Sequence, residues 1–427
     1  MADRIEALGE AVRSRAAELV ALTQALIRIP TVNPPGENYR DACELVAARL
    51  RPLGFDCALL RAEGAPGDSD RYPRWNLVAR REGAGPGPCV HFNGHVDVVE
   101  AGQGWTHDPF GGDLIDGKVY GRGACDMKGG LAAAIVAVEA LLEVWPKAPG
   151  AIEISATGDE ESGGYGGVAW LAERGWFARV DAVIIPEPLN KDRICLGHRG
   201  VWWAELETFG RIAHGSMPFH GDCAVRHMGA VLAEMEESLF PALAVRHTAM
   251  PVVPEGARAS TLNVNSLHGG QAEPEPGFTG WPSPVVPDRA RMVIDRRFPI
   301  EEDLDAVKAE FRGVVERAQA RRGFDYALRD LHEVHPSMTG REAPVARALA
   351  AAIQARLGRA PDYVASPGTY DQKHVDRIGR IRNCVAYGPG ILDLAHQPDE
   401  YVAVDDMLDA AVVMGTALGA LLGGEVS

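Results

Sequence analysis

The sequence predicts an α/β fold that is interrupted by a smaller α+β domain, because the hydrophobic pattern changes twice along its 427 residues. In the first part, short apolar runs alternate with helical patterns, which is typical of strands and helices that form a largely parallel sheet. A half-exposed strand pattern then introduces a region that suits a small sheet covered by two helices. The first pattern resumes afterwards. We therefore expect a discontinuous domain, 1–200 and 335–427, with 201–334 inserted into it.

The elements of the first domain follow from helical spacing, apolar runs and helix-breaking residues. The N-terminal segment carries acids, arginines and apolar residues at helical spacing up to Pro30, so it predicts a structural helix rather than a signal peptide. The "VNPPG" segment then breaks the periodicity. Buried strands are expected at 76–80, 89–92, 151–156, 182–186 and 384–387. Helices are expected at 39–53, 130–144, 167–174, 344–357 and 404–422.

The inserted domain has its own set of patterns. Strands are expected at "VWWAELETFG", "STLNVNSLHGG" and "ARMVIDRRF", and amphipathic helices at "CAVRHMGAVLAEMEESL" and "LDAVKAEFRGVVERAQAR". A loop rich in Gly, Pro and Glu, between Gly269 and Pro287, carries Phe278 and Trp281. With the neighbouring "WW" pair, this loop could cover a flat or aromatic substrate, but we favour the simpler interpretation that it packs on its own domain.

Charge and cysteine usage exclude several classes of protein. The formal net charge of -16 argues against phosphate-bearing partners, so neither nucleic acid nor an anionic membrane surface is expected to bind. No stretch of about 18 uncharged apolar residues occurs, so we expect a soluble protein without a membrane span. The seven cysteines are scattered, odd in number and without a C-x-x-C pair, which favours reduced thiols and a cytoplasmic location.

A histidine and several carboxylates fall at expected strand ends or in glycine-rich loops. His95 and Asp97 stand two residues apart, so on a strand both side chains would point to the same face. Asp126 opens a run of small residues, and further candidates follow in "DEESGG", "IIPEP" and "AHQPDE". Each one alone has an ordinary explanation as a surface or loop residue. Together they indicate a cation site, because carboxylates at these places would be costly to desolvate without one.

The donor set of this site contains nitrogen and oxygen but no thiolate. Such a set suits zinc, cobalt or manganese in an open catalytic site rather than a closed structural one. We expect Asp126 to bridge two ions. His95 and Glu187 would complete one ion site, and Glu161 and His396 the other.

Two further carboxylates are expected to act beside the metal. Asp97 would orient the imidazole of His95 and increase its basicity. Glu160 precedes a ligand but is free of the metal, which makes it the natural general base. One or two divalent ions together with such a base predict a metal-dependent hydrolase.

An ordered series of motifs resembles the M20 family of metallopeptidases and deacylases, which includes aminoacylases, acetylornithine deacetylases, succinyl-diaminopimelate desuccinylases and glutamate carboxypeptidases. The series is "IPTVNPPG", "GHVDVV", "GWTHDPF", "GRGACDMKGG", "DEESGG", "EP", "HGSMP", "VIDRRFP", "GTYD", "YGPG" and "AHQPDEYV". The resemblance implies a zinc-peptidase-like, three-layer α/β catalytic domain with an inserted α+β, ferredoxin-like lid and dimerisation domain. It implies the same metal ligands and base, and a cis peptide bond after Asp126.

The resemblance also implies roles for residues of the lid and of a later loop. His214 in "HGSMP" matches the lid histidine that, in family dimers, stabilises the oxyanion in the neighbouring active site; the alternative is a loop histidine that caps the next helix. Arg297 in "DRRF" matches the arginine that binds a substrate carboxylate, with a surface ion pair as the alternative. Gly368 and Thr369 match a loop that lines the substrate pocket. A homodimer, or a higher homo-oligomer, formed through the lid is therefore expected.

The resemblance predicts hydrolysis of an N-acyl amino acid or a similar small amide that carries a carboxylate. In that reaction Glu160 takes a proton from the attacking water and passes it to the leaving amine. Glu100 and Cys223 depart from the family pattern, where proline and asparagine are usual, and these changes concern the substrate rather than the metal centre. Two alternatives stay open: hydrolysis of a ureido, carbamoyl or aryl C–N bond, and a non-catalytic metal-binding relative.

Overall fold

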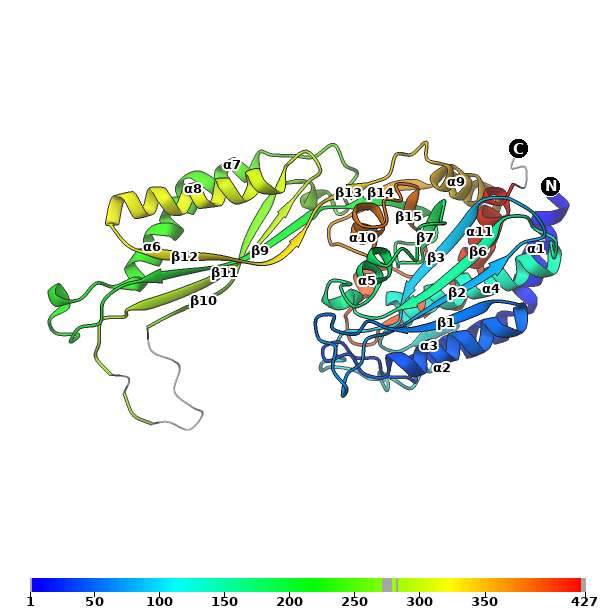
Figure 1. Cartoon of the computed structure of the whole chain (residues 1–427), viewed down its shortest axis with the longest axis horizontal. Helices are drawn as coiled ribbons and strands as arrows, with labels where there is room; N and C mark the ends of the chain where they lie inside the picture. The colour runs from blue at the N-terminus through cyan, green and yellow to red at the C-terminus, as the bar shows by residue number, and fades with distance from the viewer. Residues whose placement is uncertain (1, 271–278, 282, 424–427) are drawn as a thin grey trace. The chain divides into compact units, whose positions relative to one another are not determined.

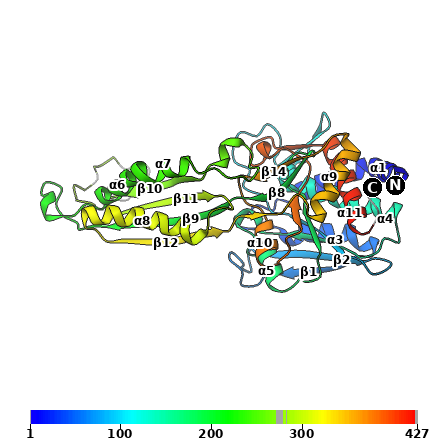
Figure 2. The ribbon, with the colours of Figure 1, turned by 90° about the horizontal axis from the view of Figure 1, so that it is seen from above.

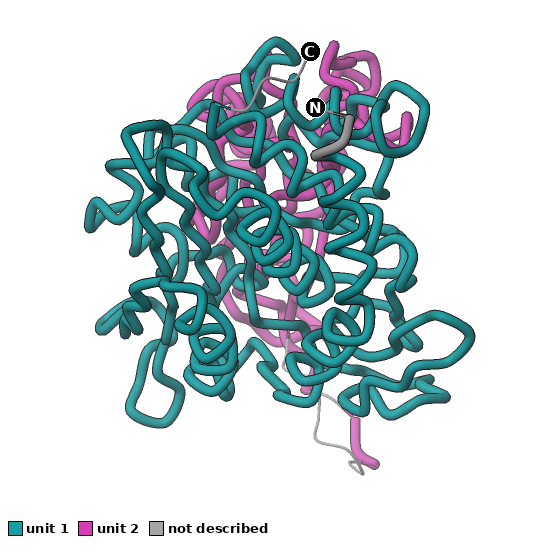
Figure 3. The backbone as a smooth tube through the Cα atoms, turned by 90° about the vertical axis from the view of Figure 1, so that its right-hand side faces the viewer, with its two compact units in different colours: residues 1–197, 338–364, 370–427 teal, residues 198–337, 365–369 magenta. Residues whose placement is uncertain are grey.

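The computed structural model describes residues 2–270, 279–281 and 283–423. The chain divides into two compact units, which Figure 3 draws in two colours. Unit 1 comprises Met1–Gly197, Met338–Val364 and Tyr370–Ser427. Unit 2 comprises His198–Ser337 together with the short stretch Ala365–Thr369. Nothing in the sequence pattern marked this last stretch as part of the inserted unit.

Unit 1 is built on a nine-stranded sheet. Across the sheet, with β14 beside β8, the strands are β1 (Asp56–Arg61), β2 (Trp75–Glu82), β6 (Ala151–Thr157), β3 (Cys89–His95), β7 (Ala182–Ile185), β15 (Cys384–Ala386), β8 (Arg193–His198), β13 (Ser337–Met338) and β14 (Asp362–Ser366). The pairs β6–β3, β3–β7 and β7–β15 are parallel. The pairs β1–β2, β2–β6 and β15–β8 are antiparallel, so the expectation of a largely parallel sheet is right only for the centre.

Helices cover both faces of this sheet, which gives the expected three layers (Figure 1). They are α1 (Ala2–Ser14), α2 (Ala16–Ile27), α3 (Tyr39–Leu50), α4 (Gly129–Val144), α5 (Val168–Glu173), α9 (Pro344–Leu357), α10 (Gln372–Arg377) and α11 (Val404–Leu421). The expected single N-terminal helix is two helices that meet at Arg15. Successive residues of β3 face opposite sides of the sheet. The backbone of Gly94 faces Leu131 of α4, whereas Asn93 donates a hydrogen bond to Asp371 at the start of α10.

A second, three-stranded sheet lies beside the start of α4 and consists of β16 (Tyr401–Ala403), β5 (Lys118–Tyr120) and β4 (Leu114–Ile115). The core of unit 1 forms between the large sheet and α4. This helix is apolar on nearly all sides and buried from Gly129 to Leu141, as a helix in the middle of a layer must be. Burial on all sides fixes the N-terminal end of α4 against the sheet.

Unit 2 is a four-stranded antiparallel sheet with helices along it (Figure 2). Its elements are β9 (Gly200–Phe209), α6 (Ala224–Glu234), α7 (Phe240–Ala244), β10 (Thr261–Gly269), β11 (Arg289–Phe298), α8 (Leu304–Arg322) and β12 (Tyr326–Val334). The sheet order β10-β11-β9-β12 with α6 and α8 as connections is the expected ferredoxin-like arrangement. Alternate side chains such as Trp202, Leu206 and Met292 are buried with Phe311 of α8.

The tryptophans of unit 2 have different environments. Trp202 lies in the core, and its indole N–H donates to Asp330 at 2.7 Å, whereas Trp203 is at the surface beside His332. Trp281 is 93% exposed, so the interpretation that its loop packs on its own domain is wrong for this residue. Phe278 of the same loop lies outside the described residues.

All seven cysteines are free thiols. Five of them are buried: Cys43, Cys89, Cys125, Cys195 and Cys384. Within the described part of the chain, a search for membrane spans finds no helix with the necessary length and hydropathy.

Candidate metal centre and active site

The five expected metal ligands come together at one edge of the sheet of unit 1. His95 is the last residue of β3, and Glu187 follows its parallel neighbour β7. Glu161 lies in the 3₁₀ turn just after β6, the other parallel neighbour of β3. Asp126 lies in the turn before α4, and His396 in the loop before β16. The carboxyl ends of adjacent parallel strands meet at one sheet edge, which explains why distant segments converge here.

Two glycines at the start of α4 permit this convergence. A Cβ on Gly130 would lie 1.9 Å from the carbonyl oxygen of Pro186, and a Cβ on Gly129 would lie 2.4 Å from that of Ala124. No side chain fits at such distances, so Gly130 allows the helix to approach the end of β7 this closely, and Gly129 allows the tight turn after Ala124. The expected cis peptide bond is confirmed between Asp126 and the next residue.

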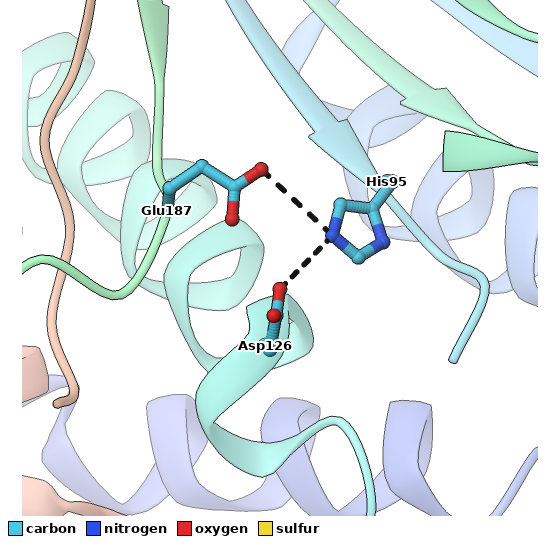
Figure 4. Close-up of side chains that lie close together, drawn as sticks. All are labelled: His95, Asp126 and Glu187. Carbon is cyan, nitrogen blue, oxygen red and sulfur yellow. Dashed lines mark hydrogen bonds and ion pairs between the residues drawn. The ribbon is translucent and has the colours of Figure 1, made fainter. Parts of the chain in front are cut away.

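The first candidate metal group consists of His95, Asp126 and Glu187, whose side chains point toward one another (Figure 4). The Nε2 atom of His95 lies 3.1 Å from Asp126 Oδ1 and 3.9 Å from Glu187 Oε1. The Nδ1 atom of His95 lies 3.0 Å from the backbone carbonyl oxygen of Asp97 and donates to it. This bond fixes the ring and leaves Nε2 to face the carboxylates, which is the orientation of a metal-ligating histidine.

The second candidate group consists of Asp126, Glu161 and His396. The Nε2 atom of His396 lies 3.2 Å from Glu161 Oε1 and 3.6 Å from Asp126 Oδ2. The two carboxylate oxygens of Asp126 therefore face different groups. Both groups offer histidine nitrogen and carboxylate oxygen only, so the residues fit a divalent cation such as zinc, cobalt or manganese.

Several side chains of these groups have pKa values above their usual range, whereas the pKa of Asp126 is lowered although burial opposes this, chiefly by its hydrogen bond with His95. Burial raises the pKa of Glu161 to about 7. Burial and the negative charge of Asp126 raise the pKa of Glu187 well above its usual range. The hydrogen bond to Glu161 raises the pKa of His396 to about 9, although burial opposes this. Crowded negative charge in a buried place is the condition that a bound cation relieves.

Metal binding to the metal-stripped protein is expected to release protons, because the ligands coordinate in their deprotonated forms. Glu161 is mostly protonated at a pH below its pKa of about 7, and His396 at a pH below its pKa of about 9. The apparent affinity for zinc should therefore rise with pH, by about tenfold per unit for each proton released. Calorimetric titrations in buffers of different ionisation enthalpy give the proton count. A count near zero at neutral pH would contradict these ligands.

The carboxylate of Asp97 holds the loop that carries Glu160 and Glu161. It accepts hydrogen bonds from the backbone N–H of Glu160 at 3.2 Å, from that of Glu161 at 3.0 Å, and from the Asn33 side chain at 2.9 Å. Its Oδ1 atom is 3.6 Å from His95 Nδ1. The closest contact to His95 is thus made by the backbone of Asp97, and its carboxylate serves mainly the loop.

Glu160 is not a member of either candidate metal group. Its Oε1 atom accepts a hydrogen bond of 2.8 Å from the ammonium group of Lys373, which is only 3% exposed. Burial opposes the charge of Lys373, yet the carboxylates of Glu160 and Asp371 raise its pKa above the ordinary value. The sequence analysis missed Lys373, because "GTYDQKH" contains no signal for a contact 213 positions away.

Glu400 is a second residue that the sequence analysis missed. Its Oε1 atom accepts from the backbone N–H of Cys125 at 2.8 Å and from that of Asp126 at 3.0 Å. Its Oε2 atom accepts from Arg122 at 2.5 Å, and both charged side chains are 1% exposed. This buried pair fixes the turn that presents Asp126. The only signal in the sequence was the position of Glu400 inside the motif "AHQPDEYV".

In unit 2, His214 is exposed and lies in the loop after β9. Its Nδ1 atom accepts a hydrogen bond of 3.1 Å from the backbone N–H of Ser216. The proton of the neutral ring therefore lies on Nε2, which makes that atom a donor. This contact is local, but neither the 3₁₀ helix Pro218–His220 nor α6 has a side-chain cap, so His214 does not cap the next helix. A donor at Nε2 is what an oxyanion contact requires.

Arg297 lies in β11 and pairs with Asp295 of the same strand. Its Nε atom is 2.6 Å from Asp295 Oδ1, and its Nη2 atom is 2.9 Å from Oδ2. The ion-pair alternative therefore describes its contacts within unit 2. A substrate carboxylate would have to compete with Asp295 for this guanidinium group.

Arg199 is a buried cation of unit 2 that the sequence analysis did not single out. Its guanidinium group donates to the carbonyl oxygens of Pro367 at 3.1 Å and Ala259 at 3.2 Å. Burial and the neighbouring charge of Arg297 lower its pKa to about 10. The expected pocket residues Gly368 and Thr369 directly follow Pro367, and the Gly368 N–H donates to Ser366 Oγ at 3.1 Å. This loop and Arg199 are thus in direct contact.

Comparison with known sequences gives a consistent result. The profile of Peptidase family M20/M25/M40 matches residues 91–420. A protein from Rhodospirillum centenum named succinyl-diaminopimelate desuccinylase is 32% identical over 410 residues, which cover 93% of this chain and 96% of that protein. A protein of the same name from Methylobacterium radiotolerans is 32% identical over 417 residues, covering 94% and 96%.

Comparison with solved structures supports the fold. Human carnosine dipeptidase 1 has a TM-score of 0.75 at 20% identity, over 98% of each chain. The Bacillus subtilis YXEP protein, described as a dinuclear metal binding peptidase from the M20 family, has a TM-score of 0.66 at 16% identity, over 97% of this chain and 100% of that chain.

The fold and the sequence relationship together define a hydrolase of carbon–nitrogen bonds. The chain belongs to peptidase family M20/M25/M40. The family and the fold class that the motifs predicted are therefore confirmed.

Proposed function

We propose that the chain hydrolyses the amide bond of a small N-acyl amino acid, whose free carboxylate contributes to binding. The observation that carries this proposal is the pair of candidate metal groups that share Asp126, with the carboxylate of Glu160 next to them in the chain. Relatives that are 32% identical over nearly their whole length are named succinyl-diaminopimelate desuccinylases. N-succinyl amino acids are therefore the first acyl class to test.

We infer that two divalent ions bind to this site. His95 and Glu187 would hold one, Glu161 and His396 the other, and Asp126 both. When bound, such ions supply Lewis-acid polarisation of the scissile carbonyl and make a bound water more acidic. Zinc, cobalt and manganese all suit these donors.

Glu160 supplies the acid–base chemistry in this proposal. Because Lys373 occupies its Oε1 atom, Oε2 is the oxygen that accepts a proton from the attacking water. The same carboxyl group then gives this proton to the leaving amine, so the carboxylate is restored at the end of the cycle. His214 donates its Nε2–H to the substrate oxygen as negative charge develops there. It does so across a homodimer formed through unit 2.

Arg199 and Arg297, with Gly368 and Thr369, are proposed to bind the substrate carboxylate. Arg199 directly precedes β9, and Val201 of that strand pairs with Arg297 of β11. One guanidinium group thus comes from the residue before β9 and the other from the adjacent strand β11. The guanidinium group of Arg199 donates to carbonyl oxygens and so keeps its positive charge available for an anion.

Replacement of Arg199 by methionine is expected to raise KM by about 10- to 100-fold and to change kcat little. A hydrogen bond to a charged group contributes about 1.5–3 kcal/mol, which corresponds to this range. Steady-state kinetics with an N-acyl amino acid as substrate measure the changes in KM and kcat separately. Arg289→Met, which removes an exposed arginine paired with Glu207 in the same unit, is the matched control. An unchanged KM in folded R199M would place the carboxylate elsewhere.

The proposed function is tested by metal-stripped protein reconstituted with zinc, cobalt or manganese. The panel contains N-succinyl, N-acetyl and N-formyl amino acids, dipeptides, ureido acids and aromatic amines. Metal-dependent release of a free amino acid from an N-acyl substrate supports the proposal. Release of ammonia from a ureido acid or an aromatic amine would overturn it in favour of another C–N bond. Metal binding without turnover on the whole panel would favour a non-catalytic role.

We further propose that the enzyme acts in the cytoplasm. Its cysteines are free and mostly buried, as is usual for proteins of reducing compartments. Its strong negative charge disfavours binding to nucleic acid and to anionic membrane surfaces.

A further inference from the structure

The short helix α10 contacts the loop of the general base through residues to which the proposed function gives no role. Asp371 precedes this helix, and Lys373 and His374 lie in its first turn. The loop runs from Glu160 to Gly164 and begins three residues after the end of β6. Both segments belong to unit 1, so their contacts lie within one compact body.

Three contacts join α10 to this loop. The ammonium group of Lys373 donates to Glu160 Oε1 at 2.8 Å. The Nε2 atom of His374 lies 2.6 Å from the carbonyl oxygen of Gly163 and donates to it. The carboxylate of Asp371 lies so close to Gly164 that a Cβ on this glycine would be 2.8 Å from Oδ1. The loop is therefore held at a side chain and at a carbonyl group, and Asp371 packs closely against its backbone at Gly164.

A chain of buried hydrogen bonds fixes Asp371 from behind. Its Oδ2 atom accepts from Asn93 at 2.9 Å, and Asn93 Oδ1 accepts from the Ser155 hydroxyl at 2.7 Å. The Ser155 hydroxyl is 2.7 Å from His91 Nε2, and His91 Nδ1 is 3.0 Å from Glu153 Oε2. All five side chains are at most 3% exposed.

This chain is anchored in the centre of the sheet. His91 pairs with Glu153, and Asn93 with Ser155, across the parallel strands β3 and β6. Side chains on paired residues of two buried strands have little freedom to move. Asp371 therefore has a fixed position. Burial raises its pKa to about 7, and in its charged form the carboxylate, whose Oδ1 atom accepts no hydrogen bond from the described residues, attracts Lys373.

We infer that Lys373 is a positioning residue that holds Glu160 with its Oε2 atom toward the substrate, and that Asp371 and its hydrogen-bond chain orient Lys373. This inference rests on the proposed role of Glu160. A glutamate on a 3₁₀ turn has several rotamers, and general base catalysis requires one of them. An ammonium group that is 3% exposed and bonded to Glu160 is placed to select that rotamer rather than to bind a substrate.

The test compares Lys373→Met and Lys373→Arg with the wild-type holoenzyme. K373M is expected to lower kcat by a factor of about 10 to 100, the cost of a misplaced catalytic group, with KM changed by less than about twofold. Metal content, measured by mass spectrometry, should stay unchanged. K373R keeps a cationic donor and should recover most of kcat. Crystal structures should show Glu160 displaced in K373M and restored in K373R.

Lys308→Met is the matched control, because Lys308 also pairs with two carboxylates, Asp330 and Glu333, but lies in unit 2. It should leave kcat unchanged. An unchanged kcat in K373M, or a raised KM with normal kcat, would overturn the inference. If K373M does not fold, the variant Asp371→Asn tests the inference instead. Asparagine has the shape of aspartate, and its side-chain oxygen can still accept the hydrogen bond from Asn93. D371N should lower kcat several-fold at constant KM, and an unchanged kcat would overturn the inference.

The two proposals fail in different ways. If the wild-type enzyme hydrolyses no amide of the panel, the proposed function fails. The crystal structures still report whether Lys373 fixes the Glu160 side chain. If the wild-type enzyme is active and Glu160 keeps its position in K373M, only the inference on Lys373 fails.

Discussion

Replacement of Glu160 by glutamine is expected to lower kcat by a factor of about 10²–10⁴, the usual contribution of a general acid–base group. Glutamine has the same shape, and its carbonyl oxygen can still accept the hydrogen bond from Lys373. It cannot accept a proton from water at neutral pH. The variant should therefore keep its fold, its metal and its KM, and lose only the proton transfer. Stopped-time assays with the best substrate of the panel measure kcat.

The neighbouring residue provides the matched comparison. Glu161→Gln changes the same functional group one position later, but Glu161 belongs to a candidate metal group. This variant should lose metal affinity, and excess metal should restore part of its activity. Excess metal should not restore E160Q. If E160Q loses metal instead, or keeps its kcat, Glu160 is not the base.

The cluster of candidate metal ligands was predictable because the chemistry of such a site restricts both residue type and position. A site for a borderline cation needs histidine and carboxylate side chains, and a parallel sheet collects them at strand ends. His95 and Glu187 satisfy both conditions. His95 is the last residue of β3, and Glu187 lies just after the end of β7. Lys373 does not have the required residue type, and Glu400 does not lie at the end of a parallel strand. Their contacts depend on how α10 and the last loop pack, which local patterns in the sequence do not encode.

The elements of the fold were predictable where burial imposes a period. Residues 344–357 and 404–422 have continuous helical patterns, and α9 and α11 occupy nearly these ranges. Strand β12 was missed because most of "YALRDLHEV" is exposed, so its alternation is weak. The break at Arg15 was missed because the helical pattern continues through it without glycine or proline. In both cases tertiary packing decided what the local pattern left open.

Replacement of Asp126 by alanine is expected to remove both metal ions and, with them, all measurable turnover. Asp126 is the only residue shared by the two candidate groups, with Oδ1 toward His95 and Oδ2 toward His396. Each ion would lose one of three protein ligands in a single substitution. Metal content after dialysis should fall from about two ions per chain to well below one. Plasma mass spectrometry measures it.

His396→Ala distinguishes a shared ligand from an ordinary one. His396 belongs to the second group alone, so this variant should retain about one ion, held by the first group. Asp70→Ala, which removes a fully exposed carboxylate paired with Arg61, should retain both ions and controls for the loss of an aspartate in unit 1. If D126A also retains one ion, Asp126 serves a single site. The proposal that Asp126 holds both ions would then have to be given up, whereas two separately held ions would remain.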